Sequence, residues 1–154
     1  MTYREKLSNK CAALLKLVDG VQGYYLSCAD PDRKSFIETT IGAAIWYLPR
    51  NNAQLFTGKI SKDALLKNEK SEDHLFPRKI AAQEILNFDW NAESNPVKKL
   101  SDLYLKKYGK FNYISKKENK KLVKFQKSNV FTDSDAAYSH AMIEMVDFYT
   151  SLQS

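Results

Sequence analysis

Apolar residues recur at helical spacing through most of the chain, and this periodicity restricts it to a mainly helical fold. The clearest stripe begins after Asp30-Pro31 and ends before Pro49. It consists of Phe36, Ile37, Thr40, Ile41, Ala44, Ile45 and Leu48. Asp30 is a favourable N-cap, and proline is tolerated at the first helical position because its missing N–H has no partner there. The sequence therefore predicts a helix across this segment.

Similar stripes predict further helices. One runs from Tyr3 to Val18 with Gly20 as its stop, and a short one is capped by Ser61. The remaining helices are predicted at 78–86, 96–108, 116–127 and 134–152. The last should bury Tyr138, Ala141, Met142, Met145, Tyr149 and Leu152.

Two short stretches, 72–76 and 111–115, favour strands. The predicted fold class is α+β and predominantly helical, with a small β-hairpin and an adjoining helix embedded in a helical domain. We expect one domain over residues 1–154. Within it, 1–70 form an N-terminal helical part, 71–127 the strand–strand–helix core with a helical insertion at 79–110, and 128–154 a C-terminal helix.

The composition fits a folded, soluble protein of the cytoplasm. Hydrophobic residues make up 44% of the chain and aromatic residues 12%, which excludes a disordered chain. No apolar run is long enough to cross a bilayer, and the charged N-terminus lacks the features of a secretory signal. Two cysteines, Cys11 and Cys28, form no disulfide framework.

Positive charge is concentrated in one segment. Between Lys98 and Lys127 there are eleven lysines and two acidic residues, Asp102 and Glu118, whereas the whole chain has a net charge of +6. Basicity confined to one segment is typical of a protein with a polyanionic partner. A solvated lysine face that only maintains solubility would give the same pattern.

Two pieces carry groups suited to phosphodiester hydrolysis, Glu-Asp-His-Leu-Phe-Pro-Arg-Lys at 72–79 and Phe-Asn-Tyr-Ile-Ser-Lys-Lys-Glu-Asn-Lys-Lys at 111–121. A neutral imidazole such as that of His74 can accept a proton from water near neutral pH. Asp73 and Asn119 offer oxygens to a hard divalent cation, which can stabilise charge on phosphate.

Neighbouring residues on a strand point to opposite faces, so Asp73 would face the metal and the helix carrying Asn119, while His74 would face an incoming phosphate. Asn112 begins the second strand, opposite the first. Its amide is expected to hydrogen-bond the backbone near His74 and hold the imidazole in place.

The Asp-His-Leu-Phe-Pro-Arg piece resembles the Asp-His-x-x-Pro signature of HNH endonucleases, and residues 112–121 are similar to the second half of that motif. The resemblance covers about twenty positions, and Asn119 stands where many members have a histidine. It implies a ββα-metal fold, Mg²⁺ or Mn²⁺ as cofactor, and cleavage of DNA, with RNA also possible.

On this resemblance, His74 would be the general base, Asp73 and Asn119 the metal ligands, and Asn112 the orienting residue. Substrate phosphates would be bound by basic residues next to the proposed base and on the proposed metal helix. These are Arg78, Lys79, Lys116, Lys117, Lys120, Lys121, Lys124 and Lys127.

Two alternatives use the same basic segment. In the first, residues 98–127 belong to a non-catalytic DNA- or RNA-binding module, and Asp73 and His74 are structural. In the second, the lysines bind an acidic protein partner.

Overall fold

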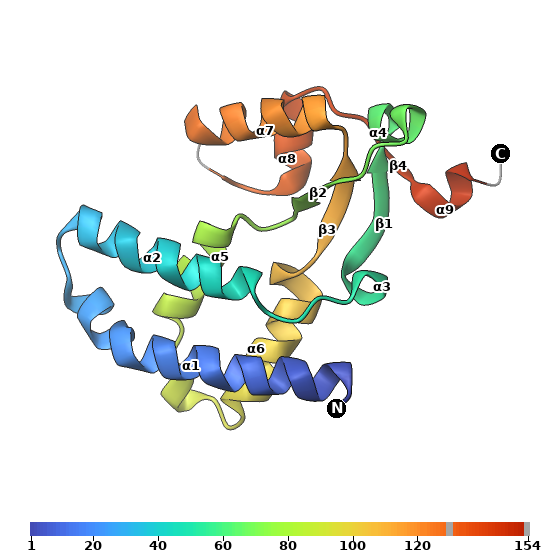
Figure 1. Cartoon of the computed structure of the whole chain (residues 1–154). Coiled ribbons are helices and arrows are strands. Elements are labelled where there is room, and N and C mark those ends of the chain that lie inside the picture. The colour runs from blue at the N-terminus through green and yellow to red at the C-terminus, as the bar shows by residue number, and fades with distance from the viewer. Residues whose placement is uncertain (129–130, 153–154) are drawn as a thin grey trace. The chain divides into compact units, whose positions relative to one another are not determined.

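The computed structural model describes residues 1–128 and 131–152. Their contacts divide the chain into two compact units (Figure 1). The first unit comprises Met1–Asn51 and Phe76–Tyr108, and the second comprises Asn52–Leu75 and Gly109–Ser154. The fold is mainly helical with one small sheet, so the predicted α+β class is confirmed.

The boundaries of the units differ from those predicted at residues 70 and 127. The segment between the two predicted strands was expected to be an insertion into the strand–strand–helix core. Most of it, Phe76–Tyr108, instead groups with the N-terminal helices. The physical reason is that its buried residues, such as Ala82 and Ile85, pack on those helices.

The first unit consists of helices. Its elements are α1 (Tyr3–Ser27), α2 (Pro31–Trp46), α5 (Arg78–Asn87), the 3-10 turn η1 (Trp90–Ala92), α6 (Pro96–Leu103) and the π-helical turn η2 (Tyr104–Tyr108). Asp30 caps α2 through a hydrogen bond from the Asp32 amide, and Pro31 is its first residue, as predicted. The first helix passes through Gly20, the predicted stop, because its buried stripe continues from Val18 to Tyr25.

Close packing of α2 on α5 depends on Gly42. A Cβ atom at this position would lie 3.1 Å from the carbonyl oxygen of Arg78. The glycine therefore allows the two backbones to approach.

The second unit contains a four-stranded sheet. Its elements are α3 (Asn52–Leu55), β1 (Phe56–Ser61), α4 (Lys62–Lys67), β2 (Ser71–His74), β3 (Phe111–Ile114), α7 (Lys116–Ser128), α8 (Ser134–His140), β4 (Met145–Asp147) and α9 (Phe148–Ser151). The strand order is β2-β3-β1-β4. β1 runs parallel to β3, and the other two pairs are antiparallel.

The predicted strands at 72–76 and 111–115 correspond to β2 and β3, but β1 and β4 were not predicted. β1 lacks a regular alternating pattern because its register shifts between Phe56 and Ile60, where Gly58 has a φ of 87°. β4 lies inside the predicted helix 134–152, so that prediction is wrong as a single helix: α8 ends at His140, and only Phe148–Ser151 is helical again, as α9.

The end of α8 explains this correction. Met142 adopts a left-handed conformation, with φ 55°, and the amides of Met142 and Ile143 donate to the carbonyls of Ser139 and Tyr138. This pair of hydrogen bonds is the Schellman arrangement that ends a helix. Met142 is 88% exposed rather than buried, and Tyr149 and Leu152 are also exposed.

Helices α7 and α8 pack over one face of the sheet (Figure 1). The core on this side consists of Ile114, Leu122, Ala137, Tyr138 and Ile143. The other face carries aromatic rings, with Phe56 packed against Phe111, Tyr113, Phe148 and Tyr149.

Candidate functional site

The predicted order of strand, strand and helix is present in the second unit. β2 and β3 form an antiparallel pair in which Asp73 lies opposite Asn112 and His74 opposite Phe111. α7 begins at Lys116, directly after Ser115. The long segment between the strands therefore does not prevent the hairpin-like pairing.

A capping box sets the start of α7. The Glu118 amide donates to the Ser115 hydroxyl oxygen, and the Ser115 amide donates to Oε2 of Glu118 at 2.9 Å. The same carboxylate accepts a 2.5 Å hydrogen bond from the hydroxyl of Ser61, which is the N-cap of α4. Glu118 thus joins the N-termini of two helices and places Asn119 in the first turn of α7.

Asp73 lies on the face of the sheet that α7 and α8 cover. Its Oδ2 accepts a 2.5 Å hydrogen bond from the hydroxyl of Tyr138 on α8. Burial raises the pKa of the Asp73 carboxyl, and the hydrogen bond from Tyr138 opposes that shift only in part. The pKa of Tyr138 is raised in turn, first by burial and then by the neighbouring Asp73. A positive charge close to Asp73 would favour its ionised form.

Asn112 has partners other than the one predicted. Its amide nitrogen donates to the Tyr138 hydroxyl at 2.9 Å, and its amide oxygen accepts a hydrogen bond from the hydroxyl of Thr57. The expectation that it orients His74 through the nearby backbone is corrected, because Asn112 faces the same side as Asp73. It is connected to Asp73 through Tyr138, whose hydroxyl accepts a hydrogen bond from Asn112 and donates one to Asp73.

His74 lies on the opposite face of the sheet, as the alternation of strand side chains predicted. Its ring centroid is 5.9 Å from that of Phe111, its cross-strand neighbour. The side chain is half-buried. Asp73 and His74 are the last two residues of β2, which is an edge strand of the sheet, and their side chains lie on opposite faces.

The two predicted metal ligands, Asp73 and Asn119, offer carboxylate and amide oxygens, which are the ligand types of a hard cation. Oδ2 of Asp73 accepts a hydrogen bond from Tyr138, and the half-exposed Asn119 lies in the first turn of α7, a helix that packs on β2. No cluster of three or more His, Cys, Asp and Glu side chains able to hold a metal exists among residues 1–128 and 131–152. Mg²⁺ commonly takes one or two protein oxygens and completes its shell with water and phosphate.

The six lysines predicted on the helix are all exposed. They are Lys116, Lys117, Lys120, Lys121, Lys124 and Lys127. Within the described part of the chain, no carboxylate lies within ion-pair distance of their ammonium groups. The acidic residue of α7, Glu118, is only 8% exposed and points into the unit. The outer surface of α7, here called the lysine face, therefore carries six exposed ammonium groups, with the Glu69 carboxylate bound to the Lys116 amide at its N-terminal end.

The other predicted phosphate-binding residues belong to the first unit. The Arg78 guanidinium lies over the ring of Trp46, 4.7 Å from its centroid. The Lys79 ammonium donates to Ser35 at 2.7 Å and lies 3.7 Å from a carboxylate oxygen of Glu38. Both side chains thus already have partners on α2 or at its end.

The basic segment 98–127 is also divided between the units. Lys98 pairs with Asp102, and Lys107 pairs with Glu84, both within the first unit. Among the described residues of this segment, only the part that includes α7 forms a surface of unpaired ammonium groups. The continuous run of lysines in the sequence therefore overstates the size of the basic patch.

Sequence reasoning missed Thr57 and Tyr138 as members of the site. Tyr138 was predicted as an inward-facing residue, and it is buried. Its hydroxyl could have indicated a place in a polar site, because a buried tyrosine hydroxyl usually requires a hydrogen-bond partner. The sequence could not identify that partner, which lies 65 positions away.

Comparison with protein-family models, curated proteins and solved structures finds no match to this chain. In the described residues, no helix is both long and apolar enough to span a membrane.

Proposed function

We propose that the chain is a metal-dependent endonuclease that hydrolyses phosphodiester bonds in DNA, with its active site on β2, β3 and α7. The observation that carries the proposal is the antiparallel β2–β3 pair leading directly into α7, with Asp73 on the face that this helix covers. This is the strand–strand–helix order implied by the resemblance of the two motifs to HNH endonucleases.

Each predicted residue then has a distinct task. Asp73 and Asn119 would hold Mg²⁺ or Mn²⁺ through oxygen atoms, and the bound ion would supply stabilisation of negative charge on the phosphate. A ring nitrogen of His74 accepts the proton of the attacking water. Asn112 and Tyr138 are positioning residues, because their hydrogen bonds fix the orientation of the Asp73 carboxylate.

The lysine face supports a polyanionic substrate. Lys116 and Lys117 lie in the first turn of α7, where the helix dipole disfavours positive charge. Their position therefore gives no electrostatic advantage to the isolated helix, whereas it places two basic residues in the same helical turn as Asn119. Phosphate contacts of this kind position a substrate without reading its sequence.

The second candidate is a non-catalytic module that binds DNA or RNA through the lysine face. The hydrogen-bonded chain Asp73–Tyr138–Asn112–Thr57 favours it, because a buried polar network of this kind also serves to hold β2, β3 and α8 together. Under this alternative Asp73 and His74 contribute to stability alone.

Cleavage of supercoiled DNA distinguishes the two candidates. The wild type is incubated with and without Mg²⁺ or Mn²⁺ beside His74→Ala and Asp73→Asn, and the affinity of each protein for DNA is measured without metal. We expect metal-dependent nicking that His74→Ala reduces by at least about 100-fold, the usual minimum effect of losing a general base. Asp73→Asn should also reduce nicking, because it removes a metal ligand, and DNA affinity should be nearly unchanged in both variants. Full activity in His74→Ala would remove the proposed mechanism. Binding without cleavage by any of the proteins would establish the module instead.

A further inference from the structure

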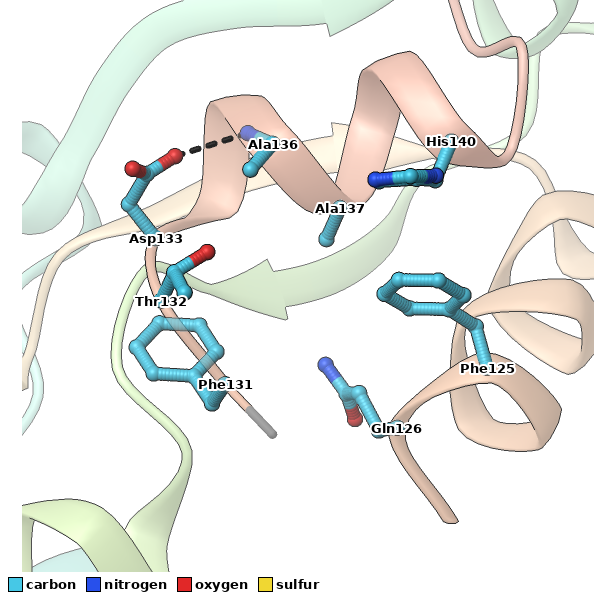
Figure 2. Close-up of a pocket in the computed structure, with 8 residues that line it drawn as sticks. All are labelled: Phe125, Gln126, Phe131, Thr132, Asp133, Ala136, Ala137 and His140. Carbon is cyan, nitrogen blue, oxygen red and sulfur yellow. Dashed lines mark hydrogen bonds between the residues drawn. The ribbon is translucent and has the colours of Figure 1, made fainter. Parts of the chain in front are cut away.

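A cavity of about 150 Å³ lies between α7 and α8 beside the lysine face. It is lined by Phe125, Gln126, Phe131, Thr132, Asp133, Ala136, Ala137 and His140. Figure 2 shows Phe125 and His140 at one side of this space and Phe131 and Thr132 at the other, with α8 above them. We propose that this cavity binds one unpaired pyrimidine base of a nucleic acid strand that runs along the lysine face. The inference rests on the proposed function to the extent that both require a nucleic acid on α7.

Aromatic side chains form two sides of the cavity. The rings of Phe125 and His140 are stacked, with centroids 5.2 Å apart and planes 23° from parallel. Phe131 lies across the opening from them (Figure 2). A planar base can stack on such surfaces, and stacking on aromatic side chains is a major source of affinity for single strands.

The size of the cavity selects a single ring. A protein cavity of about 150 Å³ accommodates a benzene molecule. A pyrimidine has one six-membered ring, whereas a purine has a fused second ring. The volume therefore favours thymine, uracil or cytosine.

The polar groups at the cavity suit the edge of a base and disfavour a phosphate. Asp133, one of the lining residues, caps α8: its Oδ1 accepts a 2.7 Å hydrogen bond from the Ala136 amide, and its carboxylate lies at the edge of the cavity, at the N-terminal end of α8 (Figure 2). A carboxylate repels a phosphate but accepts hydrogen bonds from the N–H groups of a base. The Gln126 amide adds both a donor and an acceptor.

Positive charge next to the cavity determines where the phosphate backbone of the strand binds. Lys124 and Lys127 flank Phe125 and Gln126 in α7 and are exposed. The ammonium groups beside the cavity attract the phosphate of a nucleotide to α7, and the Asp133 carboxylate at the edge of the cavity repels it. The base is then left to enter the cavity. A paired base cannot enter without leaving its duplex stack.

Equilibrium binding to three matched probes tests this assignment. We use fluorescently labelled oligothymidylate, an abasic strand with the same number of phosphates, and oligodeoxyadenylate, all with EDTA present so that no strand is cut. Because one stacked base contributes an affinity factor of about 5 to 150, oligothymidylate should bind more tightly than the abasic strand by a factor in that range. Oligodeoxyadenylate should bind more weakly than oligothymidylate.

Variants at exposed positions separate the cavity from the lysine face. His140→Ala and Gln126→Ala should bring the affinity for oligothymidylate close to that for the abasic strand and leave the abasic affinity unchanged. Ser139→Ala, a neighbouring exposed residue that does not line the cavity, is the control and should alter neither. Lys124→Gln should weaken all three probes by a similar factor.

Equal affinity for oligothymidylate and the abasic strand in the wild type would overturn the base site, and so would a His140→Ala variant that weakens both probes equally. Equal binding of oligodeoxyadenylate would overturn the choice of a pyrimidine. Failure of the nuclease proposal gives a different result, because DNA cleavage would then be absent while the base preference persists. No binding of any probe at low salt would overturn the base site together with the nucleic-acid role of α7.

Discussion

Asp73 combines an unfavourable environment with a fixed orientation. Its side chain is half-buried, burial raises the pKa of its carboxyl, and its orientation is set by the hydroxyl of Tyr138. Burial of an ionised carboxylate without a neighbouring cation lowers the stability of a protein. The divalent ion proposed for this site would offset that cost.

The raised pKa of Asp73 gives a prediction about stability and pH. The pKa of Asp73 in the folded protein lies above the ordinary value of 3.8. The contribution of Asp73 to stability is therefore fully present below pH 3.8, and it is lost as the pH rises through the folded-state pKa. Urea unfolding of the wild type and Asp73→Asn should therefore show a stability difference that turns against the wild type towards neutral pH.

Divalent metal supplies the control for this experiment. If Mg²⁺ binds the ionised Asp73, it should restore part of the wild-type stability at neutral pH and leave Asp73→Asn unaffected. A pH-independent difference between the two proteins would contradict the assigned pKa shift.

Met142 offers a second test at the scale of one residue. It holds a left-handed conformation, which costs an ordinary residue about 1 kcal/mol but glycine almost nothing. Its side chain is almost fully exposed, so its removal loses little packing. Met142→Gly should raise the free energy of unfolding by about 0.5–1 kcal/mol. Met142→Ala, which keeps the strain, should not; a similar gain in both would show that the conformation is not the cause.

At the scale of elements, the strength of the local signals decided which predictions succeeded. Helix α2 has a strong cap, an N-terminal proline and a regular stripe, and its start was predicted correctly. The segment 134–152 also has a helical stripe, but Met142 ends α8 and the following residues Met145–Asp147 pair with β1. Pairing with a distant strand outweighed the local helical pattern.

Two glycines in helices should respond oppositely to the same substitution. A Cβ atom added at Gly20 of α1 would meet no neighbouring group within 4 Å, so Gly20→Ala should stabilise the protein by about 0.5–1 kcal/mol through helix propensity. At Gly42 the added methyl would press on the Arg78 backbone, and this overpacking should outweigh the same propensity gain, with a net loss of about 1 kcal/mol.

Chemical denaturation of both glycine variants checks this pair. Because the substitution is identical, helix propensity cancels in the comparison, and the difference between the variants measures the contact of α2 with α5. Equal stabilisation by the two substitutions would mean that the backbones of α2 and α5 can move apart with little loss of free energy.

At the scale of the whole molecule, the distribution of positive charge predicts the salt dependence of binding. If about five lysines of α7 contact phosphates, a plot of log K against log salt on duplex DNA should have a slope of about −4 to −5. Replacing both Lys120 and Lys124 by glutamine should reduce the magnitude of the slope by about 1.8, since each lost contact removes about 0.9.

Lys98→Gln is the matched control for charge. Lys98 is also exposed and part of the basic segment, but it is paired with Asp102 in the first unit. Its replacement should leave the slope unchanged. A reduction of about 0.9 by Lys98→Gln, the same per charge as in the double variant, would indicate that overall net charge, rather than the lysine face, governs binding.

The sequence by itself determined the mainly helical class, most helix starts, the strands β2 and β3, and the opposite orientation of Asp73 and His74. Caps, prolines, stripes and strand alternation act between residues close in the chain, so they can be read without a fold. Only the tertiary structure decided β1 and β4, the grouping of Phe76–Tyr108 with the N-terminal helices, and the hydrogen bond from Tyr138 to Asp73. These features join residues far apart in the sequence, and local propensity carries no information about which distant partner a strand or a buried hydroxyl will find.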